Sequence, residues 1–152
     1  MPDTPDHTAL LAHLQSTLNA MPPVLAMDIR ITGYENGVLS IQAPLTANVN
    51  DKGNAFGGSL ASVMTLAGWA LVSLRLSLAG EQAEVYVADS SIRYRAPVYG
   101  DLQAAARAAP DQDWDDFLTL FRKRGRARVT VRAEIAGGAA ELEGRFVALS
   151  KG

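Results

Sequence analysis

The sequence feature that most constrains the fold is a run of apolar residues from Leu60 to Leu78. Its only polar side chains are four hydroxyl groups and Arg75, near the C-terminal end. A bilayer span needs about 20 predominantly apolar residues, so a transmembrane helix is one interpretation, and Arg75 weighs against it. A helix that is apolar on nearly all sides is also expected in the centre of a fold, where protein surrounds it. We therefore predict a buried central helix over about residues 59–78, ended by Ala79-Gly80.

Much of the remaining chain has the pattern of an antiparallel sheet. Apolar and polar residues alternate most clearly over residues 126–136, which is the period of a strand with one buried face. Asn36-Gly37 is a turn dipeptide between two shorter strands. The predicted strands span about residues 26–32, 38–43, 83–96, 100–109, 126–136 and 139–149. With an amphipathic helix at about 8–20, these elements predict one α+β domain over residues 1–152, in which a curved antiparallel sheet of about six strands wraps the central helix.

Composition narrows the classes of function. The 152 residues carry 14 basic and 16 acidic side chains, a formal net charge of -2, so no overall field attracts nucleic acid or an anionic membrane. Cysteine is absent, which excludes disulfides and thiolate chemistry and fits a reducing compartment. Residues 1–6 have no basic region and no apolar run of the signal-peptide type after them. We expect a cytoplasmic protein that binds neither nucleic acid nor membrane.

Histidine and metal chemistry are not expected. The two histidines, His7 and His13, lie in or before the N-terminal helix. Ser-His-Asp and histidine–metal catalysis both need an imidazole in the site. Acidic residues are dense only from Asp111 to Asp116, where carboxylates favour the start of a short helix. We expect neither a metal nor a separate cofactor.

The segment Asn50–Leu60 brings amide and carboxylate side chains to the start of the central helix. Its Gly57-Gly58 pair allows a ligand to approach the backbone closely. Free N–H groups at such a helix end can polarise a carbonyl and hold an oxyanion. The alternative is purely structural, with the glycines making a tight turn where helix meets sheet.

Several motifs together resemble a known family. The segment Asn50–Ser59, followed by Leu66-Ala67-Gly68-Trp69, resembles the YiiD C-terminal-type thioesterases, a branch of the hotdog superfamily. Further matches, which extend the resemblance to about residues 20–149, are Ala88–Tyr94, Pro97, Gly100-Asp101 and Glu143–Ala148. The resemblance implies a hotdog fold that hydrolyses an acyl-CoA or acyl-carrier thioester, with coenzyme A present only as part of the substrate. It also implies homodimers joined edge to edge, which can pair into tetramers, with the sites at the dimer interface.

The resemblance places the substrate at Phe56, Gly57, Gly58 and Ser59 and leaves the general base open. Many hotdog thioesterases carry His-Gly-Gly where this chain has Phe56-Gly57-Gly58, with an acidic residue following on the helix. Here Thr65 stands nine residues after Phe56, and no acid occurs in residues 53–80. The usual helix carboxylate is therefore missing.

Three polar residues are candidates to replace that carboxylate. Asn50 can orient a water or hydrogen-bond the thioester oxygen, but it is not a base at neutral pH. Asp89 shares strand parity with Val85 and Val87 and is expected to face the core, where burial would raise its pKa. A bulge would reverse that orientation, and a buried hydrogen-bond acceptor is the structural alternative for Asp89. Asp51 could act from the loop, or could be a solvent-facing acid.

Two further residues have open roles. Thr65 could position a water, or could be a hydroxyl that packs the helix. Arg126, within the basic run 122–128, could hold the phosphates of coenzyme A by charge, or could belong to a solvated face of the sheet.

Two functions remain open on this basis. The first is an enzyme that hydrolyses an acyl thioester, with the helix N-terminus as the oxyanion site and water activated through Asn50 and either Asp89 or Asp51. The second is a non-catalytic module that binds an acyl-CoA or another acyl ligand, which the missing helix carboxylate suggests.

Overall fold

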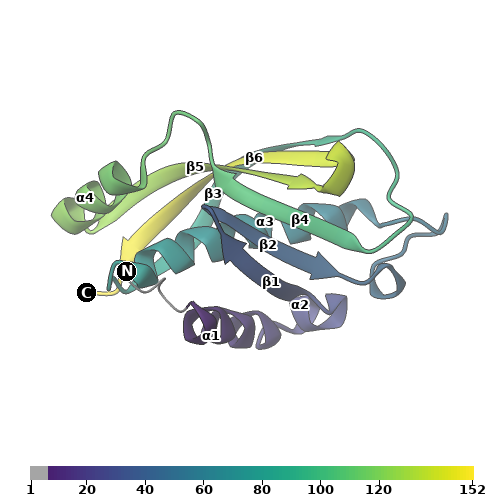
Figure 1. The fold of residues 1–152 in the computed structure, drawn as a ribbon, viewed down its shortest axis with the longest axis horizontal. Helices are drawn as coiled ribbons and strands as arrows, with labels where there is room; N and C mark the ends of the chain where they lie inside the picture. Colours follow the sequence, from purple (N-terminus) through teal and green to yellow (C-terminus); the bar gives the residue numbers. More distant parts are fainter. Residues whose placement is uncertain (1–6) are drawn as a thin grey trace.

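A computed structural model describes residues 7–152 of the chain as one antiparallel sheet folded around a long helix (Figure 1). The strands lie in the order β1-β2-β4-β5-β6-β3, so β1 and β3 form the two edges. The helices are α1 (Thr8–Asn19), α2 (Pro22–Met27), α3 (Gly57–Leu78) and α4 (Trp114–Arg124), with short 3-10 turns η1 (Leu45–Ala47) and η2 (Ala136–Gly138). The strands are β1 (Arg30–Glu35), β2 (Val38–Ala43), β3 (Ala83–Tyr94), β4 (Leu102–Ala108), β5 (Arg126–Ile135) and β6 (Ala140–Ser150).

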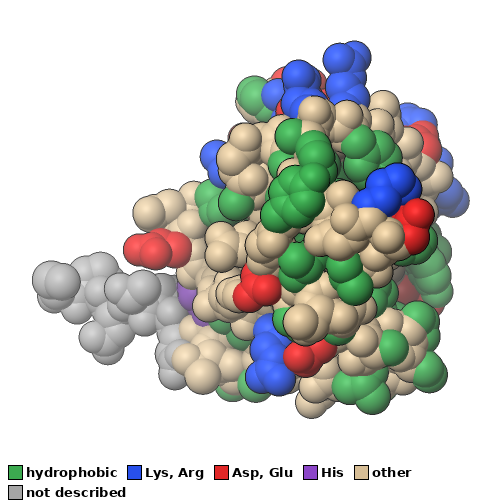
Figure 2. All heavy atoms as spheres, turned by 90° about the vertical axis from the view of Figure 1, so that its right-hand side faces the viewer, with side chains coloured by type: hydrophobic (Ala, Val, Ile, Leu, Met, Phe, Trp, Pro, Cys, Tyr) green, Lys and Arg blue, Asp and Glu red, His purple; other side chains and the backbone are tan. Residues whose placement is uncertain are grey.

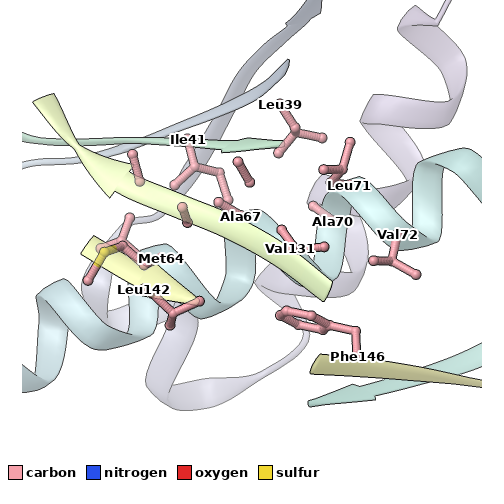
Figure 3. Close-up of a cluster of buried hydrophobic side chains, with 14 of the residues drawn as sticks. Leu39, Ile41, Met64, Ala67, Ala70, Leu71, Val72, Val131, Leu142 and Phe146 are labelled. Carbon is pink, nitrogen blue, oxygen red and sulfur yellow. The ribbon is translucent and has the colours of Figure 1, made fainter. Parts of the chain in front are cut away.

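Helix α3 is the centre of the core. It packs against β2, β3, β4, β5 and β6, and the concave face of the sheet curves over it. Half of its residues are buried, and side chains from α3 and the strands point toward one another in the close-up of Figure 3. Its length and apolarity would also suit a membrane span, but 61% of its most apolar window is buried inside the fold. The predicted hotdog arrangement of a wrapped central helix is therefore confirmed.

Gly68 in the middle of α3 has a packing role. A Cβ atom at this position would lie 2.6 Å from Cζ of Phe146 in β6, well inside van der Waals contact. Phe146 is fully buried, so its ring cannot move aside without disturbing the core. Gly68 therefore lets the helix and the sheet approach closely at this point.

The predicted strand at residues 26–32 is wrong in its first half. Pro22 and Pro23 occupy the first positions of α2, where the fixed φ of proline suits a helix start. Asp28 then adopts a left-handed conformation with φ of 54°, which ends α2 and turns the chain into β1. The two prolines follow the end of α1 and begin a second helix. The alternation of apolar and polar residues after them suggested a strand, so this helix was not predicted.

The other predicted elements are confirmed with small shifts of their ends. The strands β3 to β6 fall within two residues of their predicted bounds at each end. Asn36 and Gly37 both have positive φ, of 52° and 78°, as a tight turn between β1 and β2 requires. Asp113 caps α4 by accepting hydrogen bonds from the backbone N–H groups of Asp115 and Asp116.

Candidate active site at the start of α3

The first turn of α3 has unused hydrogen-bond donors. Phe56 is its N-cap and supplies no side-chain cap. The N–H groups of Ser59 and Leu60 donate to the Phe56 carbonyl, each at 3.0 Å. Within residues 7–152, no acceptor is recorded for the N–H groups of Gly57 and Gly58. Such a helix end, with its positive dipole, suits a carbonyl oxygen that gains negative charge.

Two aromatic rings flank these donors. The Phe56 ring lies against Gly58, and a Cβ added at Gly58 would be 2.7 Å from its Cε1 atom. Tyr94, at the end of β3, lies against Gly57, and its hydroxyl donates to the Gly57 carbonyl at 3.2 Å. Phe56 is 49% exposed and Tyr94 56% exposed, so the helix start opens to the surface between apolar walls. Figure 2 looks toward the end of the molecule where α3 begins, and hydrophobic side chains gather near the centre of this face.

The loop before α3 is held together by Asn50. Its Oδ1 atom accepts from the backbone N–H groups of Lys52 and Asn54 at 2.8 and 3.2 Å. Its Nδ2 group donates to Oδ1 of Asn54 at 2.9 Å, which leaves one amide N–H for a ligand or water. A separate backbone bond from Phe56 N–H to the Asn48 carbonyl, at 2.7 Å, fixes the chain entering the helix. Asn50 thus shapes the loop that delivers Phe56 and Gly57.

Asp51 is the carboxylate of this loop. Its side chain is 80% exposed and pairs with the neighbouring Lys52, with a distance of 3.1 Å between Oδ1 and Nζ. The carboxylate is therefore open to solvent on the same loop as Asn50.

The expected orientation of Asp89 is wrong. The pairing of β3 with β6 shifts between Val87 and Asp89, which marks a β-bulge. After the bulge Asp89 stands opposite Arg145 on the convex face, away from α3. Arg145 Nε donates to both carboxylate oxygens at 2.9 and 3.0 Å, and this hydrogen bonding holds the pKa of Asp89 below its ordinary value. The carboxylate is ionised and ion-paired, the opposite of the buried, raised-pKa group expected from strand parity.

The hydroxyl groups of α3 differ in their partners. The Ser62 hydroxyl donates to the Gly58 carbonyl at 2.8 Å, a bond within the helix. Ser59 is buried beneath the helix start. Thr65 is half-buried and lies about 12 Å further along the helix axis than Gly57, at 1.5 Å per residue. Thr65 therefore lies away from the free N–H groups at the helix start.

In a single chain, Arg126 lies at the opposite end of the molecule from the start of α3. It begins β5 directly after α4, and α4 is joined to the segment after α3 by an ion pair of 2.8 Å between Arg122 and Glu81. Since α3 has 22 residues, its two ends are about 33 Å apart. Another arginine of the convex face, Arg132, pairs with Glu143 at 3.4 Å.

One residue of the helix start, Tyr94, was not predicted as part of the site. Simple alternation from Val85 places Tyr94 on the convex face, and only the bulge turns it toward α3. An exposed aromatic at the end of an edge strand is the one available signal, and it does not identify Gly57 as the partner.

The described part of the chain, residues 7–152, contains no group of three or more histidine, aspartate or glutamate side chains placed to hold a metal ion. The polar groups beside the start of α3 are backbone donors and the side chains of the loop before it.

Comparison with known proteins matches the sequence and the fold of this chain. The family model described as "Putative thioesterase (yiiD_Cterm)" matches residues 11–150. A structure from Shewanella oneidensis, described as a "putative thioesterase", is 32% identical with a TM-score of 0.84, over 93% of this chain and 99% of that one.

Two further structures are similar. A protein of unknown function from Chlorobaculum tepidum is 26% identical with a TM-score of 0.88, over 93% of this chain and 95% of that one. A Pseudomonas aeruginosa protein described as a "probable thioesterase" is 24% identical with a TM-score of 0.74, over 98% and 99% of the two chains, which shows a shared fold. The chain, with its α3 wrapped by six strands, belongs to the YiiD C-terminal family of hotdog-fold thioesterases.

Proposed function

We propose that this protein hydrolyses an acyl-CoA or acyl-carrier thioester at the start of α3. The observation that carries the proposal is the pair of N–H groups of Gly57 and Gly58, which have no acceptor among residues 7–152. Their position between the rings of Phe56 and Tyr94 suits a thioester whose acyl group is apolar. Membership of a thioesterase family supports the reaction class.

The proposed reaction needs few groups. The thioester carbonyl oxygen binds the two free N–H groups, and a water oxygen bonds to the carbonyl carbon. The water gives up a proton as it adds, the resulting oxyanion collapses and the carbon–sulfur bond breaks. The sulfur takes up that proton and leaves as a thiol, and the acyl group is released as a carboxylic acid. Preorganised donors of this kind contribute roughly 3–4 kcal/mol to a transition state.

Water activation is assigned to the loop before α3. Asn50 has one amide N–H left to orient the water or the thioester oxygen. Asp51 is the carboxylate of that loop and can accept the proton. Thr65, further along α3, is proposed to position the water or the acyl chain.

The substrate site is proposed to be completed in a homodimer joined along the β3 edges. The side chains of Val87 and Tyr94 are 44% and 56% exposed on the concave side of this edge, which leaves an apolar strip uncovered in one chain. Antiparallel pairing of two β3 strands would bring the start of one strand beside the end of the other. Arg126 of a second copy would then lie two strands, about 10 Å, from the shared edge, where it could meet the phosphates of coenzyme A.

Sedimentation velocity tests this dimer. Val87→Lys is expected to shift the protein from dimer to monomer, because it puts a charge into the apolar strip. Thr32→Lys, on the opposite edge strand β1, is the control and is expected to leave the dimer intact. A monomeric wild-type protein would contradict the dimer. We propose a cytoplasmic location and the pairing of dimers into tetramers as further expectations.

A second function, binding of an acyl ligand without hydrolysis, has one observation in its favour. No acidic residue occurs in residues 53–80, and Asp89 faces away from α3. Calorimetry would then show saturable binding of an acyl-CoA that is recovered unchanged.

Thiol release over a panel from acetyl-CoA to palmitoyl-CoA separates the two functions. We expect turnover with at least one acyl chain, and a loss of kcat in Asp51→Asn. Asp111→Asn, in the exposed loop before α4, is the matched control and should behave as wild type. Binding without turnover would favour the second function, and neither binding nor turnover would contradict both.

A further inference from the structure

The peptide unit between Gly57 and Gly58 is contacted at its carbonyl oxygen by the side chain of Tyr94. Its carbonyl belongs to Gly57 and its N–H to Gly58, so fixing one fixes the other, because the peptide unit is planar. Glycine on both sides gives this unit more rotational freedom than any other pair of residues would. The phenol of Tyr94 donates to the Gly57 carbonyl at 3.2 Å, and its ring also contacts the space beside Gly57.

The bulge in β3 is what brings Tyr94 to this carbonyl. Before the bulge Val85 and Val87 stand opposite the buried Ala148 and Phe146 of β6, on the concave side. After it the concave positions fall one residue later, so that Tyr94 stands opposite the buried Ala140. Bulges next to active sites commonly re-aim a side chain in this way. The extra residue of the bulge therefore places Asp89 on the convex face of the sheet and Tyr94 on the concave face.

We propose that Tyr94 is a positioning residue for the reaction, which orients the Gly57–Gly58 peptide so that the Gly58 N–H faces the developing oxyanion. A hydrogen bond to a peptide carbonyl also polarises that peptide, which makes its N–H a stronger donor. This inference rests on the proposed thioester hydrolysis, and it concerns the Tyr94 hydroxyl, which acts through the Gly57–Gly58 peptide rather than on the reacting atoms.

Tyr94→Phe tests the inference because it keeps the ring and removes only the hydroxyl. Loss of one neutral hydrogen bond is expected to lower kcat by about 3- to 10-fold, with KM unchanged, because the donor matters most in the transition state. Tyr86→Phe is the matched control: Tyr86 lies on the same strand, its hydroxyl bonds Glu84 at 3.0 Å on the convex face, and its removal is expected to leave kcat as in wild type. Thermal unfolding of all three proteins checks that they remain folded.

A second measurement does not depend on activity. In amide NMR spectra, Tyr94→Phe is expected to shift the Gly58 N–H resonance, whereas Tyr86→Phe should leave it in place. An unmoved Gly58 resonance overturns the inference, as does a loss confined to KM. If the wild-type protein hydrolyses no thioester, the proposed function fails, and the Gly58 resonance alone decides whether Tyr94 orients the peptide.

Discussion

The middle and the start of α3 belong to one helix but use their backbone in opposite ways. In the middle, Gly68 removes a side chain so that the fully buried ring of Phe146 can pack against the helix. At the start, Gly57 and Gly58 lie between two half-exposed rings, and their N–H groups have no acceptor within residues 7–152. The glycine in the middle completes the packing of the core, whereas the N–H groups of the two glycines at the start remain free to bind an acceptor.

The start of α4, unlike the start of α3, has a side chain that caps its N–H groups. Asp113 accepts from the N–H groups of Asp115 and Asp116 at 2.7 and 3.3 Å, whereas Phe56 offers α3 nothing from its side chain. A polar cap on α3 would stabilise the helix by roughly 1 kcal/mol. The absence of such a cap leaves these N–H groups available for the oxyanion of the proposed reaction.

Truncating Phe146 should have the largest effect on stability. Phe146→Ala is expected to lower the free energy of unfolding by about 3–5 kcal/mol, because it removes a buried ring and leaves a cavity beside Gly68. Urea denaturation followed by circular dichroism measures the loss. Phe56→Ala is the matched control, and its loss should be far smaller because that ring is 49% exposed. Equal losses would contradict the contrast between the two regions.

Adding one methyl group at each glycine site sharpens the same contrast. Gly68→Ala is expected to cost about 1–3 kcal/mol through overpacking against Phe146, although alanine by itself favours a helix. Gly58→Ala should cost less, since the end of the exposed Phe56 ring can swing away from the new methyl. The double variant Gly68→Ala with Phe146→Leu should recover part of the loss. No rescue, or equal costs at both glycines, would count against the packing role of Gly68.

Removing the cap of α4 should have a moderate effect. Asp113→Ala is expected to cost about 1 kcal/mol, because the N–H groups of Asp115 and Asp116 lose their acceptor. Thermal unfolding monitors the change, with Asp111→Ala in the preceding loop as the control. Thioesterase activity should persist in both variants, and a lost activity in Asp113→Ala would mean that α4 contributes to the site.

Removing the ion pair between Asp89 and Arg145 should have the smallest effect on stability, and that effect should depend on pH. The pKa of Asp89 in the folded protein is below its ordinary value because of the hydrogen bonds from Arg145. The stability that this ion pair adds is therefore present above the unfolded pKa of about 3.9 and is lost as the pH falls through the folded-state pKa. Asp89→Asn should therefore be slightly less stable than wild type at neutral pH. The difference should vanish in acid, and a difference that grows in acid would contradict the pairing with Arg145.

The extent of α3 could be predicted from sequence because its apolarity on nearly all sides is unusual and has few structural explanations. The helix start also could be located, since Gly57-Gly58 follows a polar loop. The face of Asp89 could not, because a β-bulge adds one residue without any local signal and reverses every later position in the strand. The partner of Tyr94 depends on the end of β3 meeting the start of α3, which only the folded chain establishes.

The central claim is that the free N–H groups at the start of α3 hold the oxyanion of a thioester. Thiol release by wild type, Phe56→Asp and Phe56→Leu over the acyl-CoA panel tests it most directly, because an aspartate at the N-cap accepts from the second and third N–H groups of the helix. We expect Phe56→Asp to lose at least about tenfold in kcat while Phe56→Leu, which adds no cap, retains most of it. Phe56→Asp with the kcat of wild type, or a wild type without turnover, would contradict the claim.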